Sequence, residues 1–155
     1  MPLEIERKFL VEPCFLDQCT PSVSYPIKQC YLTTDPDKTI RLRIKGAEGF
    51  LTIKSRSTGI TRLEFEYQIP ANDTEQMMRL YGTCFIEKTR HEVEYAGNTW
   101  EVDVFEGDNK GLIVAEIELD DETDTFEKPE WILEEVTFDK RYANSNLVRM
   151  PYSKW

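Results

Sequence analysis

The sequence predicts a mainly β fold of the α+β type, in which one closed, eight-stranded antiparallel β-barrel carries a few flanking helices. Apolar and polar residues alternate with a period of two along eight segments, the pattern of strands with one polar and one apolar face. Turn-forming residues separate these segments, as in antiparallel hairpins. The polar faces carry pairs of charged residues of one sign, and a sheet that is free in water rarely needs such pairs.

The predicted strands follow one another over the first 120 residues. They cover residues 3–11, 28–34, 39–45, 50–56, 62–69, 86–95, 100–105 and 112–120. In the first strand Glu4, Glu6 and Lys8 share one face, because successive side chains of a strand point to opposite sides. Turns are predicted at residues 35–37, 46–49, 58–59, 97–98 and 107–108, which are rich in glycine, proline, asparagine and aspartate.

Helical signals are few. Asp73 has the character of an N-cap, Gln76 follows it three residues later, and Gly82 fits the position after the last helical turn. One helix is therefore predicted between Asp73 and Gly82. Shorter helices are predicted over residues 121–127 and 141–148, and residues 12–26 form a connection whose structure the pattern does not define.

The composition is that of one folded domain, which we expect to span residues 1–155. Apolar residues make up 40% of the chain and charged residues 31%, so a core can form. The net charge of −10 argues against general binding to nucleic acid or to an anionic membrane. No apolar run approaches the about 20 residues of a membrane span, and residues 1–6 lack the features of a signal peptide. We therefore expect a cytoplasmic protein.

The cysteines and the single histidine do not indicate a familiar site. Cys14, Cys19, Cys30 and Cys84 show no CxxC spacing, and His91 alone cannot complete a common zinc set. We expect reduced thiols. One histidine also makes a Ser-His-Asp enzyme improbable, and His91 is expected on the surface or in the wall of the barrel.

The charged strand faces allow two arrangements. In the first, an amphipathic sheet exposes its charges to water. In the second, the barrel closes with the charges inside, and the outward apolar faces are covered by helices or by a partner, which is compatible with a homodimer. The second arrangement is favoured because the charged pairs recur on strand after strand, although an interior charge must be paired, hydrated or bound to a ligand.

The candidate interior charges are nearly balanced. The acids are Glu4, Glu6, Glu64, Glu66, Glu101, Asp103, Glu116 and Glu118. The bases are Lys8, Arg41, Arg43, Lys45, Lys54, Arg62, Lys88 and Arg90. Carboxylate oxygens suit Mg²⁺ or Mn²⁺, and arginine with lysine suits phosphate oxygens. The set therefore fits a site that holds a polyanion together with hard divalent cations.

Several charged motifs follow one another along the chain. The first is the ExExK motif Glu4-Ile5-Glu6-Arg7-Lys8. The others are Gln29-Cys30-Tyr31-Leu32, Arg41-Leu42-Arg43, Thr52-Ile53-Lys54, Glu64-Phe65-Glu66, Glu87-Lys88-Thr89-Arg90, residues 101–105, Glu116-Ile117-Glu118, residues 135–137 and residues 140–142. This ordered set resembles the signature of the CYTH superfamily, the triphosphate tunnel metalloenzymes, over nearly the whole chain. It is most similar to the compact bacterial members that hydrolyse inorganic triphosphate.

The resemblance implies an eight-stranded tunnel, a triphosphate-bearing substrate and Mg²⁺ or Mn²⁺. Phosphate ligands carried over from it are Lys8, Arg41, Arg43, Lys54, Lys88 and Arg90. Metal-side carboxylates carried over from it are Glu4, Glu6, Asp103, Glu116 and Glu118, with Glu64 and Glu66 as further tunnel acids. Cys30 stands where similar sequences often have glycine. The expected reaction is hydrolysis of inorganic triphosphate to pyrophosphate and phosphate.

The resemblance also implies a Tyr–Lys pair that activates water, at Tyr31 and Lys88. Crowding by other cations would lower the pKa of Lys88 and allow it to act as a base. Simple phosphate binding by Lys88 and simple packing by Tyr31 remain open at this point, as does water activation by a second metal ion.

Other functions are weighed against this one. A class IV-type adenylyl cyclase would need an adenine-specific element, and none is clear. A thiamine or nucleoside triphosphatase of the same superfamily is a further alternative, and a thiamine triphosphatase would need an aromatic platform from Trp100 or Trp131. The charge of −10 disfavours an RNA triphosphatase. A non-catalytic polyphosphate or nucleotide binder would share the same charged motifs, whereas a lipocalin-like carrier would need an apolar interior.

Overall fold

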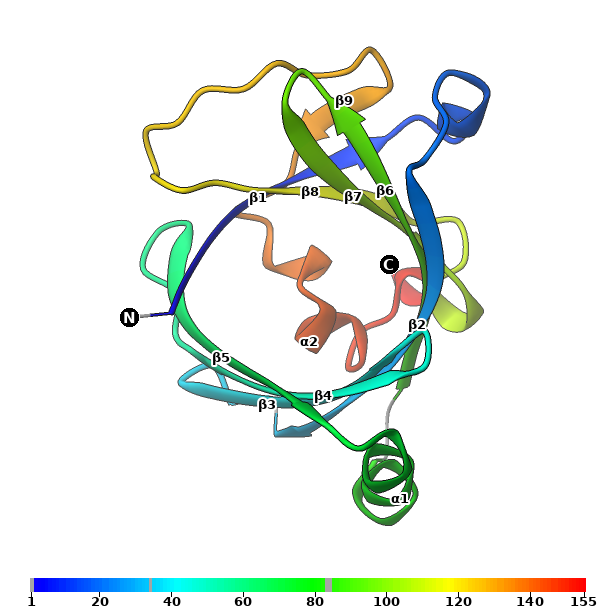
Figure 1. Cartoon of the computed structure of the whole chain (residues 1–155), viewed down its shortest axis with the longest axis vertical. Coiled ribbons are helices and arrows are strands. Elements are labelled where there is room, and N and C mark those ends of the chain that lie inside the picture. The colour runs from blue at the N-terminus through cyan, green and yellow to red at the C-terminus, as the bar shows by residue number, and fades with distance from the viewer. Residues whose placement is uncertain (1, 34, 83–84) are drawn as a thin grey trace.

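The computed structural model describes residues 2–33, 35–82 and 85–155, and in it eight antiparallel strands close into a barrel. The strands are β1 (Leu3–Val11), β2 (Val23–Thr33), β3 (Lys38–Lys45), β4 (Glu48–Ser55), β5 (Thr61–Ile69), β6 (Phe85–Tyr95), β7 (Asn98–Phe105) and β8 (Ile113–Glu118). Their order is β5-β4-β3-β2-β6-β7-β8-β1, and β1 also pairs with β5 (Figure 1). The predicted closed barrel is confirmed.

Strand β1 closes the ring because its two halves pair with different neighbours. Its first residues pair with β5, where Leu3 lies opposite Leu63, and its later residues pair with β8, where Glu6 lies opposite Glu118. A ninth strand, β9 (Ile132–Glu135), adds to the end of β1 outside the ring. This strand was not predicted, because four residues are too few to show an alternation.

The helix α1 (Ala71–Tyr81) lies outside the barrel (Figure 1). It starts directly after Pro70, so the predicted N-cap at Asp73 is wrong. Asp73 instead lies in the first turn, where its negative charge interacts favourably with the positive end of the helix dipole. Met78 packs α1 against Leu42 on the outer face of β3.

The helix predicted over residues 121–127 is wrong. One side-chain oxygen of Asp124 accepts hydrogen bonds from the backbone N–H groups of Asp120 and Asp121, at 3.1 and 3.0 Å. Asp121 accepts another from the N–H of Thr123 at 2.8 Å. Such side-chain bonds stabilise turns in competition with a helix.

The helix predicted over residues 141–148 is divided in the structure. Lys140–Tyr142 forms a short 3-10 turn, and α2 (Asn144–Leu147) follows it as a single helical turn. The connection at residues 12–26 contains a 3-10 turn at Phe15–Asp17 and the beginning of β2.

The largest apolar cluster lies on the outside of the barrel, between β1, β7, β8 and the chain that leads to β9. Phe9 and Trp100 are fully buried there, and their ring centroids are 5.5 Å apart. Phe126 and Trp131 cover Trp100, at centroid distances of 5.6 and 6.4 Å. Both tryptophans named above as candidates for an aromatic platform therefore belong to this outer core.

A second apolar cluster lies inside the ring, at one end. It contains Ile86, Phe105, Val114, Tyr142 and Leu147. The first three come from β6, β7 and β8 and point inward, like the charged residues two positions away on the same strands. The α2 segment lies within the ring in Figure 1. The barrel interior is thus charged in its middle and apolar where α2 enters.

The remaining sequence features have structural roles. Free thiols occur at Cys14, Cys19 and Cys30, and Cys84 lies outside the described residues. His91 contacts Phe15 of the outer core, and its Nδ1 pairs with Oγ of Ser24 at 2.7 Å. None of the helices in the described ranges is both long and apolar enough to cross a membrane.

Candidate active site

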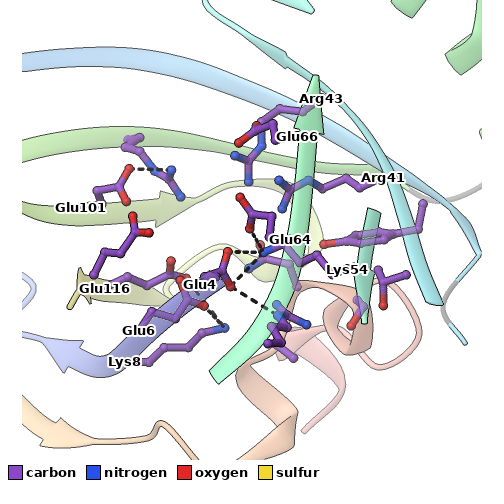
Figure 2. Close-up of a pocket in the computed structure, with 18 of the residues that line it drawn as sticks. Glu4, Glu6, Lys8, Arg41, Arg43, Lys54, Glu64, Glu66, Glu101 and Glu116 are labelled. Atoms are coloured by element: carbon purple, nitrogen blue, oxygen red, sulfur yellow. Dashed lines mark hydrogen bonds and ion pairs between the residues drawn. The ribbon is translucent and has the colours of Figure 1, made fainter. Parts of the chain in front are cut away.

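A charged cavity of about 250 Å³ lies inside the barrel (Figure 2). Every basic residue predicted for the interior lines it: Lys8, Arg41, Arg43, Lys45, Lys54, Arg62, Lys88 and Arg90. The predicted acids Glu4, Glu6, Glu64, Glu66, Glu101, Glu116 and Glu118 line it as well. Asp103 is almost fully buried and binds Lys88 and Arg90. The charged strand faces therefore point inward, and the arrangement with these charges in water is wrong.

Glu4 and Glu6 of β1, together with Glu116 and Glu118 of β8, form what we call the acidic wall. In the antiparallel register Glu6 lies opposite Glu118, and Lys8 lies opposite Glu116. Figure 2 shows Glu4, Glu6 and Glu116 gathered beside Lys8. The alternation of each strand places these carboxylates on one inward face.

Crowding changes the protonation of this wall. Burial, together with the charges of Glu116 and Glu4, raises the pKa of Glu6 to about 8. Burial alone would also raise the pKa of Glu116, but the nearby charges of Lys8 and Arg90 hold it well below its usual range. At neutral pH Glu6 therefore keeps its proton and hydrogen-bonds the ionised Glu116.

Glu4 is paired with cations from the two strands that follow β1 around the barrel on the β5 side, Arg62 of β5 and Lys54 of β4. Nζ of Lys54 donates to both oxygens of Glu4, at 2.9 and 3.2 Å, and Nε of Arg62 donates at 3.3 Å. Lys54 also pairs with Glu64 at 3.0 Å. Burial, with the charge of Arg41, lowers the pKa of Lys54 to about 8. These groups satisfy one another, so a ligand must exchange with ion pairs here.

Arg41 and Arg43 of β3 form the basic wall, and neither has a carboxylate partner in the part of the chain that the structure describes. Arg41 donates to Oγ1 of Thr52 at 3.2 Å, and its Nε is buried without a partner. Arg43 donates to Oε1 of Gln29 at 3.1 Å. Burial, with the charges of Arg41 and Arg90, lowers the pKa of Arg43 to about 9. Buried guanidinium groups without a counter-ion favour an anionic ligand.

Asp103 organises the cations of β6. It accepts two hydrogen bonds from Arg90, at 2.7 and 2.9 Å, and pairs with Nζ of Lys88 at 2.7 Å. Arg90 also donates to Glu101 at 2.8 Å. Burial lowers the pKa of Lys88 to about 7. The negative charge of Asp103 opposes this shift, and the positive charges of Arg90 and Arg43 add to it. Lys88 is therefore close to losing its charge at neutral pH.

Tyr31 lines the cavity on β2, beside Arg41 in the strand register. Its hydroxyl accepts a hydrogen bond from the amide nitrogen of Gln29 at 3.2 Å. Within the described residues, the Lys88 ammonium forms an ion pair with Asp103 and donates a hydrogen bond to Asn144, and it does not bond to Tyr31. Tyr31 and Lys88 thus share the cavity without a direct bond between them.

Some residues of the site were missed by the sequence reasoning. Gln29 and Thr52 lie on the inward faces of β2 and β4, where they hydrogen-bond to the cavity-lining Arg43 and Arg41. The alternation rule, applied to uncharged polar residues, would have found them. Ala143, Asn144 and Ser145 line the cavity from α2 and the residue before it. No local pattern marks these three, because their position depends on how α2 packs into the barrel.

The donor chemistry of the acidic wall fits a hard divalent cation, since all four groups are carboxylates on adjacent strands. In the described ranges, however, no three histidine, cysteine or acidic side chains converge as a ready-made metal site. The reason is visible in the ion pairs: Glu4 turns to Lys54, and Glu116 and Glu6 lie near Lys8, at 3.7 and 3.9 Å. A cation would have to replace these partners and the proton on Glu6.

The fold and the cavity define a class of protein: a closed β-barrel with a buried charged tunnel, in which a basic wall and an acidic wall border one cavity. Residues 2–149 match the CYTH domain family. The chain therefore belongs to the CYTH family.

Similar proteins align with this chain along nearly their whole length. The chain is 46% identical, over 156 aligned residues, to an inorganic triphosphatase of Acetivibrio thermocellus, covering 100% of this chain and 99% of the relative. It is 41% identical to an inorganic triphosphatase of Nitrosomonas europaea, covering 93% and 95%. The crystal structure of the inorganic triphosphatase NE1496 superposes with a TM-score of 0.65 and 37% identity, covering 96% of this chain and 95% of that one.

Proposed function

We propose that this protein is a metal-dependent inorganic triphosphatase, which cleaves triphosphate to pyrophosphate and phosphate inside the barrel. The observation that carries the proposal is the basic wall, because Arg41 and Arg43 are buried on one strand face without a carboxylate partner among the described residues. Their planar guanidinium groups suit phosphate oxygens. The names of two curated relatives that align along nearly the whole chain support the same reaction.

The proposed phosphate ligands are the cavity-lining cations Lys8, Arg41, Arg43, Lys54, Lys88 and Arg90. Arg41 and Arg43 are two positions apart, which is about 6.6 Å along a strand, so their head groups reach different phosphates. Lys54 lies on the neighbouring strand β4, and Lys88 and Arg90 lie on β6. A chain of phosphates can therefore contact several cations at once, which a single phosphate cannot do.

Mg²⁺ or Mn²⁺ is the proposed metal, and the acidic wall of Glu4, Glu6, Glu116 and Glu118 would hold it. Bound there, the ion would act as a Lewis acid that neutralises charge on the phosphate oxygens. Asp103 is less suited to this role than the sequence implied, because both of its oxygens already bind Arg90 and one also binds Lys88. We assign Asp103 to holding these two cations.

Lys88 is proposed as the base that takes a proton from the attacking water. Its lowered pKa of about 7 leaves part of the population as a neutral amine at physiological pH. Attack by the water oxygen on a terminal phosphorus forms one P–O bond, breaks the bridging P–O bond and releases pyrophosphate. The water proton passes to Nζ of Lys88. Tyr31 is proposed to orient this water through its hydroxyl, which Gln29 holds in place.

The aromatic side chains of the cavity help to distinguish inorganic triphosphate from thiamine triphosphate and from the ATP that a cyclase would use. Within the described residues, Tyr31 is the aromatic side chain that lines the cavity, whereas Trp100 and Trp131 are packed in the outer core. A thiamine or adenine ring would thus find little stacking surface. Inorganic triphosphate needs none.

A substrate panel tests the proposal. Phosphate release should be measured with Mg²⁺ or Mn²⁺ from triphosphate, pyrophosphate, ATP and thiamine triphosphate, each also in excess EDTA. We expect triphosphate to be hydrolysed much faster than the others and EDTA to stop the reaction. Cyclic AMP as the main product from ATP would identify a cyclase instead, and tight triphosphate binding without turnover would identify a binding protein.

A further inference from the structure

The Lys88 head group is held by two acceptors from different parts of the chain. Its Nζ lies 2.7 Å from Oδ2 of Asp103, on β7, and 3.1 Å from Oδ1 of Asn144, on α2. Asp103 is itself fixed by its paired hydrogen bonds with Arg90. Asn144 supplies the second, uncharged acceptor, and both Lys88 and Asn144 line the cavity.

Two acceptors are enough to fix the direction of a lysine nitrogen. The nitrogen is tetrahedral, so when two of its N–H groups point to Asp103 and Asn144, the bond to Cε leaves one direction free. In an ammonium group this direction carries an N–H for a phosphate oxygen, and in a neutral amine it carries the lone pair. Without Asn144, the flexible four-carbon stem of Lys88 would leave the head group free to rotate about its contact with Asp103.

Asn144 is placed by apolar anchors rather than by a long helix. Leu147, at the other end of α2, is 1% exposed in the inner apolar cluster, and Tyr142 is buried in the same cluster. The side chain of Asn146 donates to the backbone carbonyl of Lys140 at 2.7 Å and ties α2 to the preceding turn. The packing of α2 thus decides where the Asn144 amide lies.

We infer that Asn144 is a positioning residue for Lys88, which together with Asp103 aims the free direction of the Lys88 nitrogen into the cavity. The inference rests on the proposed function. It assigns a role in the reaction to α2, a segment outside the barrel strands that carry the charged motifs.

The first test compares Asn144→Leu and Asn144→Asp. Leucine has a similar size but no acceptor, and aspartate keeps an oxygen in the same place. We expect Asn144→Leu to lower kcat for triphosphate by about tenfold or more with a KM change of less than about threefold, as expected when a group acts in the transition state. Asn144→Asp keeps the oxygen but adds a charge that raises the pKa of Lys88, so kcat should return to within about threefold of the unaltered protein only at alkaline pH. Asn144→Ala also lacks the acceptor and gives the same loss if leucine disturbs α2.

A double-mutant cycle with Lys88→Ala separates positioning from a structural effect. If Asn144 acts through Lys88, adding Asn144→Leu to Lys88→Ala should change the residual kcat by less than about twofold. Asn109→Leu is the matched control. Oδ1 of Asn109 accepts a hydrogen bond from the backbone N–H of Tyr152 at 2.9 Å, away from the residues that line the cavity, so its loss should lower the Tm while kcat stays near normal.

The outcomes of these measurements test the role of Asn144 separately from the proposed triphosphatase function. An unchanged kcat in Asn144→Leu, or an equal loss with and without Lys88, overturns the inference while leaving the triphosphatase intact. A lack of triphosphate hydrolysis by the unaltered protein overturns the proposed function, and the inference with it.

Discussion

Nε of Arg43 donates a hydrogen bond to Oε1 of Gln29 at 3.1 Å, and these two residues lie directly opposite each other on the paired strands β3 and β2. A neutral amide therefore stands where a buried guanidinium group would commonly have a carboxylate. The amide satisfies one N–H of Arg43 without cancelling its charge. The charge remains available to an anion, and the protein bears the cost of burying it.

The first prediction follows from this uncompensated charge. Arg43→Met keeps much of the volume and removes the buried cation. We expect the Tm of the ligand-free protein to rise or stay unchanged, because no counter-ion is left behind, whereas kcat/KM for triphosphate falls by about 100-fold or more. Thermal unfolding and phosphate-release kinetics measure the two effects.

Arg90→Met is the matched comparison. Arg90 binds Asp103 and Glu101, so its removal leaves carboxylates without their main partner and should lower the Tm clearly. A similar fall in Tm for Arg43→Met and Arg90→Met would contradict the view that Arg43 is uncompensated.

The second prediction concerns the metal. Glu118→Gln keeps the size of an exposed member of the acidic wall and removes its charge, so turnover with Mg²⁺ should fall by at least about 100-fold. Glu134→Gln changes an exposed carboxylate on β9, outside the cavity, and should leave turnover unchanged. Full activity of the unaltered protein in excess EDTA would refute the metal requirement.

The third prediction is a pH dependence of stability in the metal-free protein. Glu6 has a pKa of about 8 when folded, against 4.5 when unfolded, so the folded state holds more protons between these values. Stability should therefore fall as pH rises through this range. Glu6→Gln removes the titrating group. The Tm advantage of Glu6→Gln over the unaltered protein should grow from about pH 5 to about pH 9 in EDTA, and a constant difference would disprove the shift.

The fourth prediction tests water activation. Lys88→Ala and Tyr31→Phe should each lower kcat on the order of 10²-fold, the usual contribution of general acid–base help, with smaller changes in KM. Tyr67→Phe, on the outer side of β5, makes the same chemical change where the ring is exposed and should have no effect. Near-normal kcat in both cavity variants would assign Lys88 to phosphate binding and Tyr31 to packing.

The strands and their inward charges could be predicted because both follow from a period of two within each segment. Glu4, Arg41 and Glu116 needed only the alternation rule to be placed on one interior face. The same rule also places Ile86 and Phe105 inward, but the sequence reasoning assigned apolar residues to the outer face as a group. The change from a charged to an apolar interior was therefore missed.

The contributions of α2 could not be predicted in this way. Asn144 belongs to a single helical turn whose position depends on the packing of Leu147 against residues from β6, β7 and β8. The contact between Lys88 and Asn144 joins residues that are 56 positions apart. Neither a local propensity nor a charge pattern specifies such a contact. In residues 121–127 the helical signal was weak, and the hydrogen bonds from backbone N–H groups to the side chains of Asp121 and Asp124 stabilise a turn instead.

The way in which β1 closes the ring has a consequence for biosynthesis. During translation β1 emerges first, yet Leu3 must wait for Leu63, and Glu6 must wait for Glu118. The nascent chain can pair β2 to β5 as hairpins well before the ring is complete, but its first strand stays without its full set of partners until β8 has left the ribosome. Such distant pairings make folding slow. Until β8 is available the ring cannot close, so any sheet that forms before then is open and its charged face is in contact with water.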